Sequence, residues 1–342
     1  MRKAILWDKA ADGKARCSLC AHRCVISEGN FGSCGMRQVR GGELFTYAYG
    51  KVAAKNLDPI EKKPLYHFLP GTTTYSVAVP GCNFTCSFCQ NWEISTLEAS
   101  KGGIPGQDAE PEAIIEDALV SGAQSVSYTY TEPTVFFEYA LEISKKAQKK
   151  GLKNVFVTNG YMTVEALNVI APFLDAVNVD LKFFNDETYR KICGASLQPV
   201  LDTIVKIRSS GIWMEVTTLV IPGVNDSEEE LRDIAGFICN LDPEMPWHVS
   251  AFHPDHKMRN VQPATSSELE EVKIMAAETG LKHVYAGNLP GDANTFCPAC
   301  GTLLIKRRSY KTKAIDENFR AGKCLICGAG VQGRWATGIE EI

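Results

Sequence analysis

The sequence contains no long hydrophobic run and no excess of positive charge. Its apolar stretches are short and interrupted by charged residues, glycine or proline, which excludes a transmembrane helix. The opening MRKAILWDKAADGK carries basic side chains but no apolar core, which argues against a secretory signal and for a cytoplasmic location. Lysine and arginine number 36 against 40 aspartates and glutamates, a net charge of −4. This balance argues against a general nucleic-acid binder.

Cysteine is the residue type that the sequence has in unusual number. Its 13 cysteines are an odd count, so they cannot all pair as disulfides within the chain. Eleven of them form three groups of four, three and four at short spacings, and two stand alone. In a chain expected in the cytoplasm, such groups are typical of metal sites rather than disulfides.

Between about residues 74 and 290, short β-rich runs alternate with amphipathic helical stretches. The expected strands lie at 75–80, 125–130, 154–158, 176–181, 213–221, 248–252 and 283–286. The expected helices lie near 111–121, 134–150, 163–171, 196–210, 227–240 and 265–279. This alternation predicts an α/β fold with a parallel sheet, either a partial or complete (β/α) barrel or a doubly wound sheet. In both architectures the site lies at the C-terminal ends of the strands.

Changes in composition divide the chain into three expected domains. A cysteine-rich segment covers 1–70, the barrel covers 71–290, and a second cysteine-rich module covers 291–342. The first segment is too short and loop-rich to bury much core, so its cysteines are its expected organiser.

The last module carries two C-x2-C knuckles, a pattern specific for a metal held by four sulfurs. Its ligands are Cys297, Cys300, Cys324 and Cys327. The spacing indicates a zinc-ribbon or rubredoxin-like module, and zinc is favoured over iron because ribbons are commoner. The basic run at 306–313 is expected to be a solvated hairpin.

The N-terminal group has the irregular spacing C-x2-C-x3-C-x9-C. Its members are Cys17, Cys20, Cys24 and Cys34. Four thiols suit zinc or an iron–sulfur cluster, and the spacing leaves both open.

The loop GCNFTCSFCQN at 81–91 carries the strongest signal. Cys82, Cys86 and Cys89 follow the first expected barrel strand at spacings that place three sulfurs around one centre. Structural zinc and ordinary iron–sulfur sites take four protein ligands. Three therefore indicate a 4Fe–4S cluster with one iron open to an outside ligand, and the alternative is a structural zinc completed by a distant Cys or His.

This C-x3-C-x2-C loop, with Phe88 directly before its last cysteine, resembles that of radical S-adenosylmethionine (SAM) enzymes. The likeness extends over most of 60–255. Runs similar to glycyl-radical-enzyme activases, notably the pyruvate formate-lyase activase, are EKKPLYHFLPGT at 61–72, TNG at 158–160, DLK at 180–182 and IPGVND at 221–226.

YTEP at 130–133 stands where the activases carry Gly-Gly-Glu-Pro. This run and the two outer cysteine groups resemble the radical enzyme of the AmmeMemoRadiSam group. Tyr130 and Thr131 replace the two glycines that form a flat backbone edge for the methionine amino group in the activases.

The resemblance implies that the open iron binds the amino and carboxylate groups of S-adenosylmethionine. An electron then cleaves the sulfonium to methionine and a 5′-deoxyadenosyl radical. The pocket residues that the resemblance implies are Phe88, Thr131, Glu132, Thr158, Asn159, Asp180, Lys182, Thr217 and His253. The structural alternatives for them are turn chemistry, a helix N-terminal carboxylate, a strand-end ion pair and a packed histidine.

The substrate, a small molecule or a protein, is left unidentified. Cys193 is a candidate hydrogen-atom donor, with simple burial as its alternative. Implied partners are an electron donor such as flavodoxin or ferredoxin, and Memo-like and Ammecr-type proteins. Two further hypotheses are a glycyl-radical-enzyme activase and a non-catalytic zinc or RNA-binding scaffold. The first needs a protein partner, and the second needs zinc in all three cysteine groups.

Overall fold

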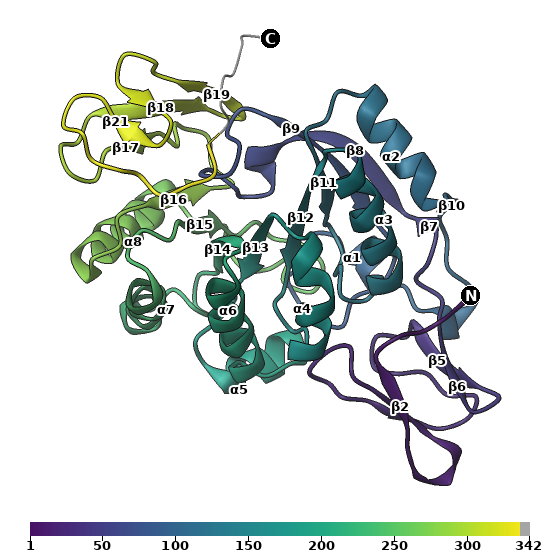
Figure 1. Cartoon of the computed structure of the whole chain (residues 1–342). Helices are drawn as coiled ribbons and strands as arrows, with labels where there is room; N and C mark the ends of the chain where they lie inside the picture. The colour runs from purple at the N-terminus through teal and green to yellow at the C-terminus, as the bar shows by residue number, and fades with distance from the viewer. Residues whose placement is uncertain (336–342) are drawn as a thin grey trace.

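An open eight-stranded sheet forms the centre of the molecule (Figure 1), in a computed structural model that describes residues 1–335. In spatial order its strands are β16 (Val284–Gly287), β15 (Trp247–Ala251), β14 (Trp213–Val220), β13 (Ala176–Asp180), β12 (Lys153–Thr158), β11 (Ser125–Tyr128), β9 (Thr73–Ala78) and β8 (Ala54–Pro59). All neighbours from β9 to β16 are parallel, and β8 is antiparallel to β9.

The seven expected barrel strands are confirmed, and the sheet is a partial barrel. Strands β16 and β8 occupy its two edges and do not pair with each other in the part of the chain that is described. A complete barrel is therefore wrong. A doubly wound sheet is also wrong, because the parallel strands follow one another in sequence order without the reversal that such a sheet requires.

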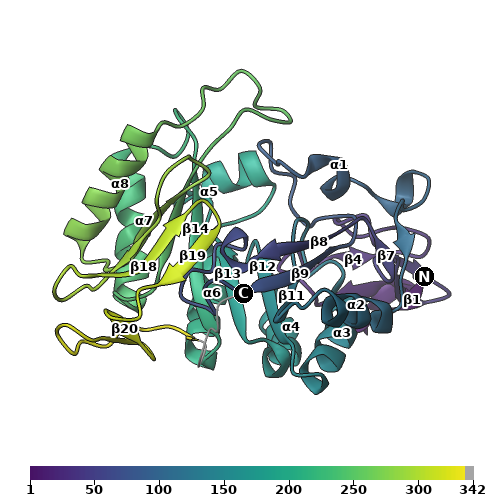
Figure 2. The same cartoon turned by 90° about the horizontal axis from the view of Figure 1, so that it is seen from above.

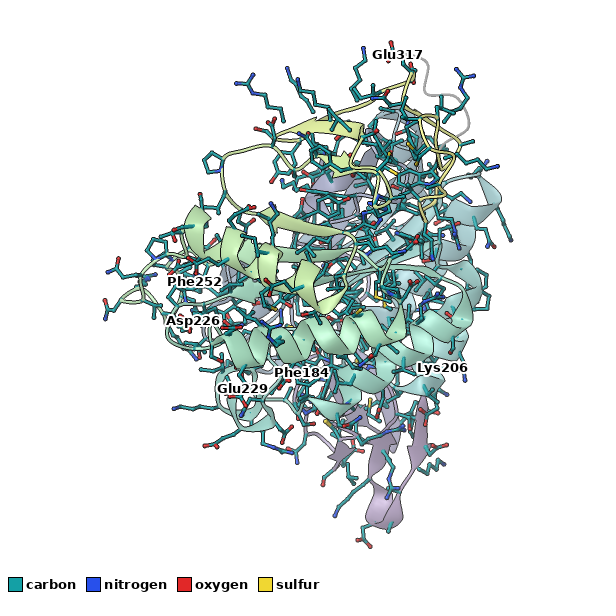
Figure 3. All side chains as sticks on the ribbon, turned by 90° about the vertical axis from the view of Figure 1, so that its left-hand side faces the viewer. Phe184, Lys206, Asp226, Glu229, Phe252 and Glu317 are labelled. Atoms are coloured by element: carbon teal, nitrogen blue, oxygen red, sulfur yellow. The ribbon has the colours of Figure 1, made fainter. Side chains whose placement is uncertain are left out.

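Helices cover the outer face of the sheet, as the alternation predicts (Figures 1 and 2). They are α2 (Pro111–Val120), α3 (Phe137–Lys149), α4 (Val164–Ile170), α6 (Gln198–Ser210), α7 (Glu228–Leu241) and α8 (Ser266–Thr279). Short helical segments are α1 (Trp92–Ser95), α5 (Asp186–Thr188) and a π-helix at Tyr189–Cys193. Figure 3 faces this layer, with Lys206 of α6 and Glu229 of α7 labelled.

Local capping explains where the helices start. At α7 the Ser227 hydroxyl accepts from the Glu230 backbone N–H, and three acidic residues occupy the first turn. At α8 Thr265 and Glu268 form a complete capping box. None of the helices in the described chain is long and apolar enough to cross a bilayer.

The N-terminal segment folds into small sheets around its cysteines. One sheet contains β1 (Arg2–Lys3), β6 (Glu43–Thr46) and β5 (Arg37–Arg40), and another contains β2 (Trp7–Lys9), β3 (Ala15–Cys17) and β4 (Val25–Ile26). A third pairs β7 (Lys51–Val52) with β10 (Gln107–Asp108). The segment is anchored on the barrel by the buried ion pair between Arg37 and Glu138 of α3, 2.5 Å long.

The C-terminal module lies on the opposite side of the molecule from this segment (Figures 1 and 2). Its strands are β17 (Thr295–Phe296), β18 (Leu303–Arg308), β19 (Lys311–Ala314), β20 (Phe319–Arg320) and β21 (Lys323–Cys324). The expected basic hairpin is β18–β19, but one of its cations, Arg307, is fully buried and donates to the Tyr66 carbonyl at 2.6 Å. The expected module also includes residues 336–342, which lie outside the described residues.

The segment between β8 and β9 enters the barrel from its N-terminal end. There the buried Glu215 of β14 accepts from the backbone N–H groups of Tyr66 (2.9 Å) and His67 (2.7 Å). Asn178 of β13 donates to the Pro64 carbonyl at 2.8 Å. This segment therefore closes the interior from below and leaves the other end open to form a site.

Candidate active site

A cavity of about 300 Å³ opens at the C-terminal ends of the barrel strands. Its walls include all three cysteines of the central loop, together with side chains from the ends of β11, β12, β13, β14 and β15. Sequence-predicted residues that line it are Cys82, Cys86, Cys89, Phe88, Thr131, Glu132, Asn159, Asp180, Lys182 and Thr217. The parallel sheet thus brings most of the predicted pocket to one place.

Two of the three cysteines of the central loop are held by local hydrogen bonds. The Phe84 backbone N–H donates to the Cys82 sulfur at 3.4 Å, and the Cys89 sulfur lies 3.2 Å from the Ser95 hydroxyl. Three thiols on the cavity wall, with no fourth cysteine of the described chain beside them there, fit a cluster that keeps one metal position open, whereas a structural zinc takes four protein ligands.

Glu132 lies at the end of β11 beside this loop and is 1% exposed. One carboxylate oxygen accepts from the Thr134 hydroxyl (2.6 Å) and the Thr158 hydroxyl (2.7 Å). The other accepts from the Asn159 backbone N–H at 2.8 Å. Burial raises the pKa of Glu132, and these donors oppose that shift. The carboxylate is fixed in direction and faces the cavity as an acceptor for a cationic ligand group.

Tyr130, which stands in place of a glycine, adopts a left-handed backbone with φ of +66°. That conformation is unfavourable for a side chain of this size. It is held by the tyrosine hydroxyl, which donates to the buried Asp58 carboxylate and accepts from Asn56 at 3.2 Å. The Lys63 ammonium also lies 4.6 Å from the ring centroid. Tyr130 therefore adopts a backbone conformation that glycine favours, and contacts with residues of β8 stabilise it.

Asp180 and Lys182 form an ion pair of 2.9 Å on the cavity wall. The same Lys182 ammonium lies 5.5 Å from the centroid of the Phe88 ring, which is itself 5% exposed. On the neighbouring strand, the Thr217 hydroxyl donates to Asn178 at 2.9 Å. These contacts present one cation and one carboxylate near the cluster loop.

Three predicted residues do not line the cavity. Thr158 lies behind Glu132 and supports it, as described above. His253 is exposed, and its Nε2 atom contacts the backbone carbonyl of the cavity residue Asn288 at 2.9 Å. Cys193 is fully buried at the end of the π-helix, and its sulfur lies 3.5 Å from that of Cys86. This places Cys193 against a cysteine of the central loop and off the cavity wall.

Sequence reasoning missed a charged group on the cavity floor. The buried Asp58 at the end of β8 accepts from Lys62 at 2.8 Å and Lys63 at 2.7 Å. Burial opposes its ionised form, but hydrogen bonds from Lys62, Lys63 and Tyr130 hold the pKa of Asp58 well below its ordinary value. Both lysines line the cavity. The signal for them was the KKP sequence at 62–64, in the segment between β8 and β9.

Lys63 is expected to make stability depend on alkaline pH. Burial lowers the pKa of Lys63 to about 8, although Asp58 opposes the shift. Above about pH 8 the folded protein has lost this proton, whereas the unfolded chain retains it up to about pH 10.4. Stability relative to a Lys63→Met variant should therefore rise between about pH 8 and pH 10.4, as chemical unfolding of both proteins would measure. A difference that is constant or falls over this range would contradict the assignment.

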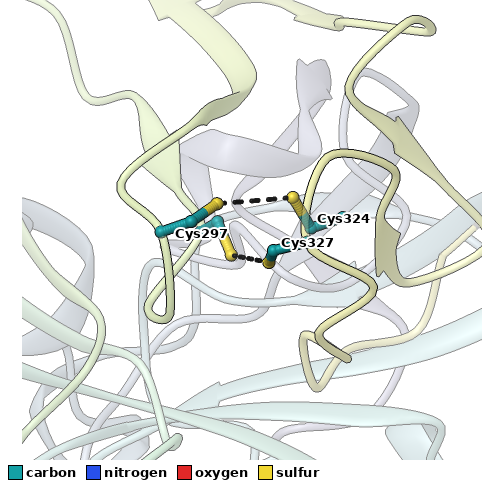
Figure 4. Close-up of side chains that lie close together, drawn as sticks. Cys297, Cys324 and Cys327 are labelled. Atoms are coloured by element: carbon teal, nitrogen blue, oxygen red, sulfur yellow. Dashed lines mark hydrogen bonds between the residues drawn. The ribbon is translucent and has the colours of Figure 1, made fainter.

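The C-terminal cysteines form a compact four-sulfur group (Figure 4). Their four sulfurs lie mutually within 4.8 Å, with 3.6 Å between Cys297 and Cys327 and 3.7 Å between Cys300 and Cys324. Four thiolates bound at about 2.3 Å to one tetrahedral metal would lie about 3.8 Å apart. The structure therefore brings the four predicted sulfurs together as a group that could hold a single metal ion.

Comparisons with known proteins place the chain in a family. The Radical SAM superfamily model matches residues 76–235. An uncharacterized protein of Methanocaldococcus jannaschii is 44% identical over 331 residues, covering 96% of this chain and 98% of that protein. The pyruvate formate-lyase-activating enzyme of Clostridium pasteurianum is 23% identical, covering 56% of this chain and 85% of that enzyme.

The solved structure of a radical SAM methyltransferase from Sphaerobacter thermophilus has the same fold, with a TM-score of 0.51. It is 16% identical and covers 69% of this chain and 71% of that one. The chain belongs to the Radical SAM superfamily and is an enzyme. The predicted resemblance to radical SAM enzymes is thereby confirmed. The alternative hypothesis of a non-catalytic scaffold is not supported.

Proposed function

We propose that this protein is a radical SAM enzyme in which Cys82, Cys86 and Cys89 hold a 4Fe–4S cluster. The observation that carries the proposal is the single cavity lined by these three sulfurs, Glu132, Asp180 and Lys182. Three cysteine ligands leave one iron for the amino acid part of S-adenosylmethionine. When bound, the cluster supplies one electron for cleavage of the sulfonium to methionine and a 5′-deoxyadenosyl radical.

The chain's own residues bind and orient the cofactor in this proposal. Glu132, fixed by Thr158 and the Asn159 backbone, accepts from the methionine ammonium. Lys182, paired with Asp180, lines the same cavity and attracts a carboxylate. Thr131, Thr217 and Phe88 complete the pocket. The barrel walls exclude water from a radical that abstracts hydrogen from a substrate not yet identified.

The test is anaerobic reconstitution of the full chain with iron and sulfide. Dithionite and S-adenosylmethionine are then added, and 5′-deoxyadenosine and methionine are quantified by mass spectrometry. Equal amounts of both products, absent without dithionite, are expected. A protein that binds iron and sulfide yet leaves S-adenosylmethionine intact would contradict the proposal.

Activation of a glycyl-radical enzyme is the second candidate, favoured by the similarity to the Clostridium pasteurianum activating enzyme. It implies a protein substrate and a one-electron donor of the flavodoxin or ferredoxin type. Mixing the reduced enzyme with a glycyl-radical protein from the same cell should then give a glycyl radical signal in electron paramagnetic resonance. The AmmeMemoRadiSam grouping implies Memo-like and Ammecr-type partners instead. Co-purification with these proteins would favour that grouping over activation of a glycyl-radical enzyme.

The metal in the C-terminal group is proposed to be zinc with a structural role. Cys297 and Cys324 are buried in the module core, and Arg307 anchors the module to the segment below the barrel. A closed four-sulfur site has no position for a substrate. Metal analysis should find one zinc per chain that remains after the iron–sulfur cluster is removed.

A further inference from the structure

The π-helix at Tyr189–Cys193 lies directly against the central cysteine loop, although the two segments are far apart in the sequence. The Cys193 carbonyl accepts from the Thr85 backbone N–H at 2.9 Å. The Ile192 carbonyl accepts from the Ser87 backbone N–H at 3.1 Å. These two N–H groups flank the second cysteine of the loop, and they bind carbonyls that the end of a helix leaves without partners. The helix therefore holds the loop on both sides of that cysteine.

The glycine that ends this helix makes the close approach possible. Gly194 has a left-handed backbone with φ of +68°. A Cβ atom at this position would lie 2.6 Å from the Thr85 hydroxyl, which is shorter than a van der Waals contact. Glycine adopts this backbone without strain and leaves the space free. The contact between helix and loop therefore depends on the residue that follows Cys193.

The π-helix also contacts the end of β13. The Tyr189 hydroxyl accepts from the Lys182 backbone N–H at 3.1 Å. The buried Tyr189 ring packs edge-on against Phe183 and against Phe84 of the central loop. The position of Cys193 is thus fixed relative to both segments. Isolated π-helical turns of this kind are rare and occur frequently at functional sites.

The side chain of Cys193 reaches the sulfur of Cys86 from this helix. Cys193 is fully buried and lies off the wall of the barrel cavity, and the two sulfurs are 3.5 Å apart. A cysteine that binds a metal does so as a thiolate and has no proton to donate. With Cys86 bound in this way, Cys193 is the member of the pair that donates an S–H hydrogen bond.

A hydrogen bond to a ligand sulfur alters the reduction potential of an iron–sulfur cluster. Reduction adds one negative charge to the cluster and its thiolates, and a donor to a ligand sulfur stabilises the more negative state. A thiol is a weak donor. Burial strengthens the electrostatic contribution of this hydrogen bond, because it lies in a low dielectric. The expected effect is therefore a higher potential, which makes the cluster easier to reduce.

We propose that the Cys193 thiol donates a hydrogen bond to the Cys86 thiolate and thereby raises the reduction potential of the central cluster. This inference rests on the proposed function, which assigns the cluster to Cys82, Cys86 and Cys89. Cys193 is a positioning residue that acts through Cys86. It keeps its proton while the cluster takes up one electron from the reductant, and no bond to Cys193 forms or breaks. This role differs from donation of a hydrogen atom, which would require contact with a substrate.

Redox titration of reconstituted Cys193→Ala and wild type tests the proposal. The paramagnetic signal of the reduced cluster is measured at a series of fixed potentials, without S-adenosylmethionine. At a given potential, the ratio of reduced to oxidised cluster should fall about threefold to tenfold in the variant, and a tenfold change corresponds to about 59 mV for a one-electron couple. Its iron content should equal that of wild type. A ratio within about twofold of wild type would overturn the proposal.

Cys193→Ser separates the hydrogen bond from packing, because a serine hydroxyl also donates. Its potential should return from the value of the alanine variant toward that of wild type. A serine variant with the low potential of the alanine variant would attribute the shift to packing and overturn the proposal. Cys239→Ala is the matched control, because it removes a partly buried cysteine on α7 and should leave the potential unchanged.

Iron and product analysis distinguish the remaining outcomes. Loss of iron from both Cys193 variants would show that Cys193 is needed to hold the cluster and would overturn the role in tuning its potential. A wild type that takes up no cluster would overturn the proposed function and this inference together. A wild type that holds a cluster yet leaves S-adenosylmethionine intact would contradict the proposed function alone, and the redox titration would still decide the role of Cys193.

Discussion

Replacement of Cys82, Cys86 and Cys89 together by alanine is expected to reduce 5′-deoxyadenosine formation to background. The three sulfurs line one cavity with Glu132, and no other cysteine of the described chain lines it. Without these thiolates the proposed 4Fe–4S cluster has no cysteine ligands, so about four irons should be lost relative to wild type. Iron analysis and mass spectrometry of the product measure the two effects on the same sample.

The matched control is Cys239→Ala. This cysteine lies on α7, and its thiol donates to the Thr279 carbonyl at 3.5 Å, away from the cavity. It should retain the iron content and product formation of wild type. The zinc content of both variants should be unchanged, which shows that the C-terminal module remains folded. Product formation by the triple variant at the wild-type rate would show that another centre cleaves S-adenosylmethionine.

Regular periodicity made the fold predictable. The run WMEVTTLVI predicted β14 because a nearly continuous apolar run is typical of a strand in a parallel sheet covered on both faces. The structure buries this strand accordingly. Ser227 and the acids after it predicted the start of α7 because they satisfy and neutralise a helix N-terminus. Closure of the sheet was not predictable in this way, because it depends on whether its two edge strands meet.

The site was predictable where chemistry lies within a short run and not where it depends on distant contacts. The central cysteines were found from their spacing alone. Cys193 reaches the sulfur of Cys86 only because the π-helix and its left-handed end at Gly194 turn it there. In the sequence, Tyr130 is visible only as a replacement of a glycine. The hydrogen bond from its hydroxyl to Asp58 reaches a different strand, β8. Such contacts leave no local pattern in the sequence.

His253 shows the opposite limit. Its position after β15 correctly placed it at the C-terminal end of the barrel strands. The side chain is nevertheless exposed and contacts the Asn288 backbone rather than the cavity. A strand end fixes where the chain lies and not where a side chain points. The lysines on the cavity floor were missed for the related reason that they come from the segment that enters the barrel from below.

That floor carries the second large prediction. Asp58→Asn is expected to lower the free energy of unfolding by about 2–3 kcal/mol, because the buried Lys63 loses its counter-charge and must either stay charged without a partner or give up its proton, its pKa being only about 8 with Asp58 present. It also weakens the hydrogen bond that holds Tyr130 in its left-handed backbone. Anaerobic urea unfolding of the reconstituted protein at neutral pH measures the loss.

Asp108→Asn is the matched control for this substitution. Asp108 pairs with Lys51 on the surface at 2.6 Å, with its side chain 81% exposed, so its loss should cost no more than about 1 kcal/mol. Adding Lys63→Met to Asp58→Asn should recover part of the stability, because the unpaired buried charge is then absent. Equal effects of the two aspartate substitutions, or no recovery in the double variant, would show that the Asp58–Lys63 pair does not support the cavity floor.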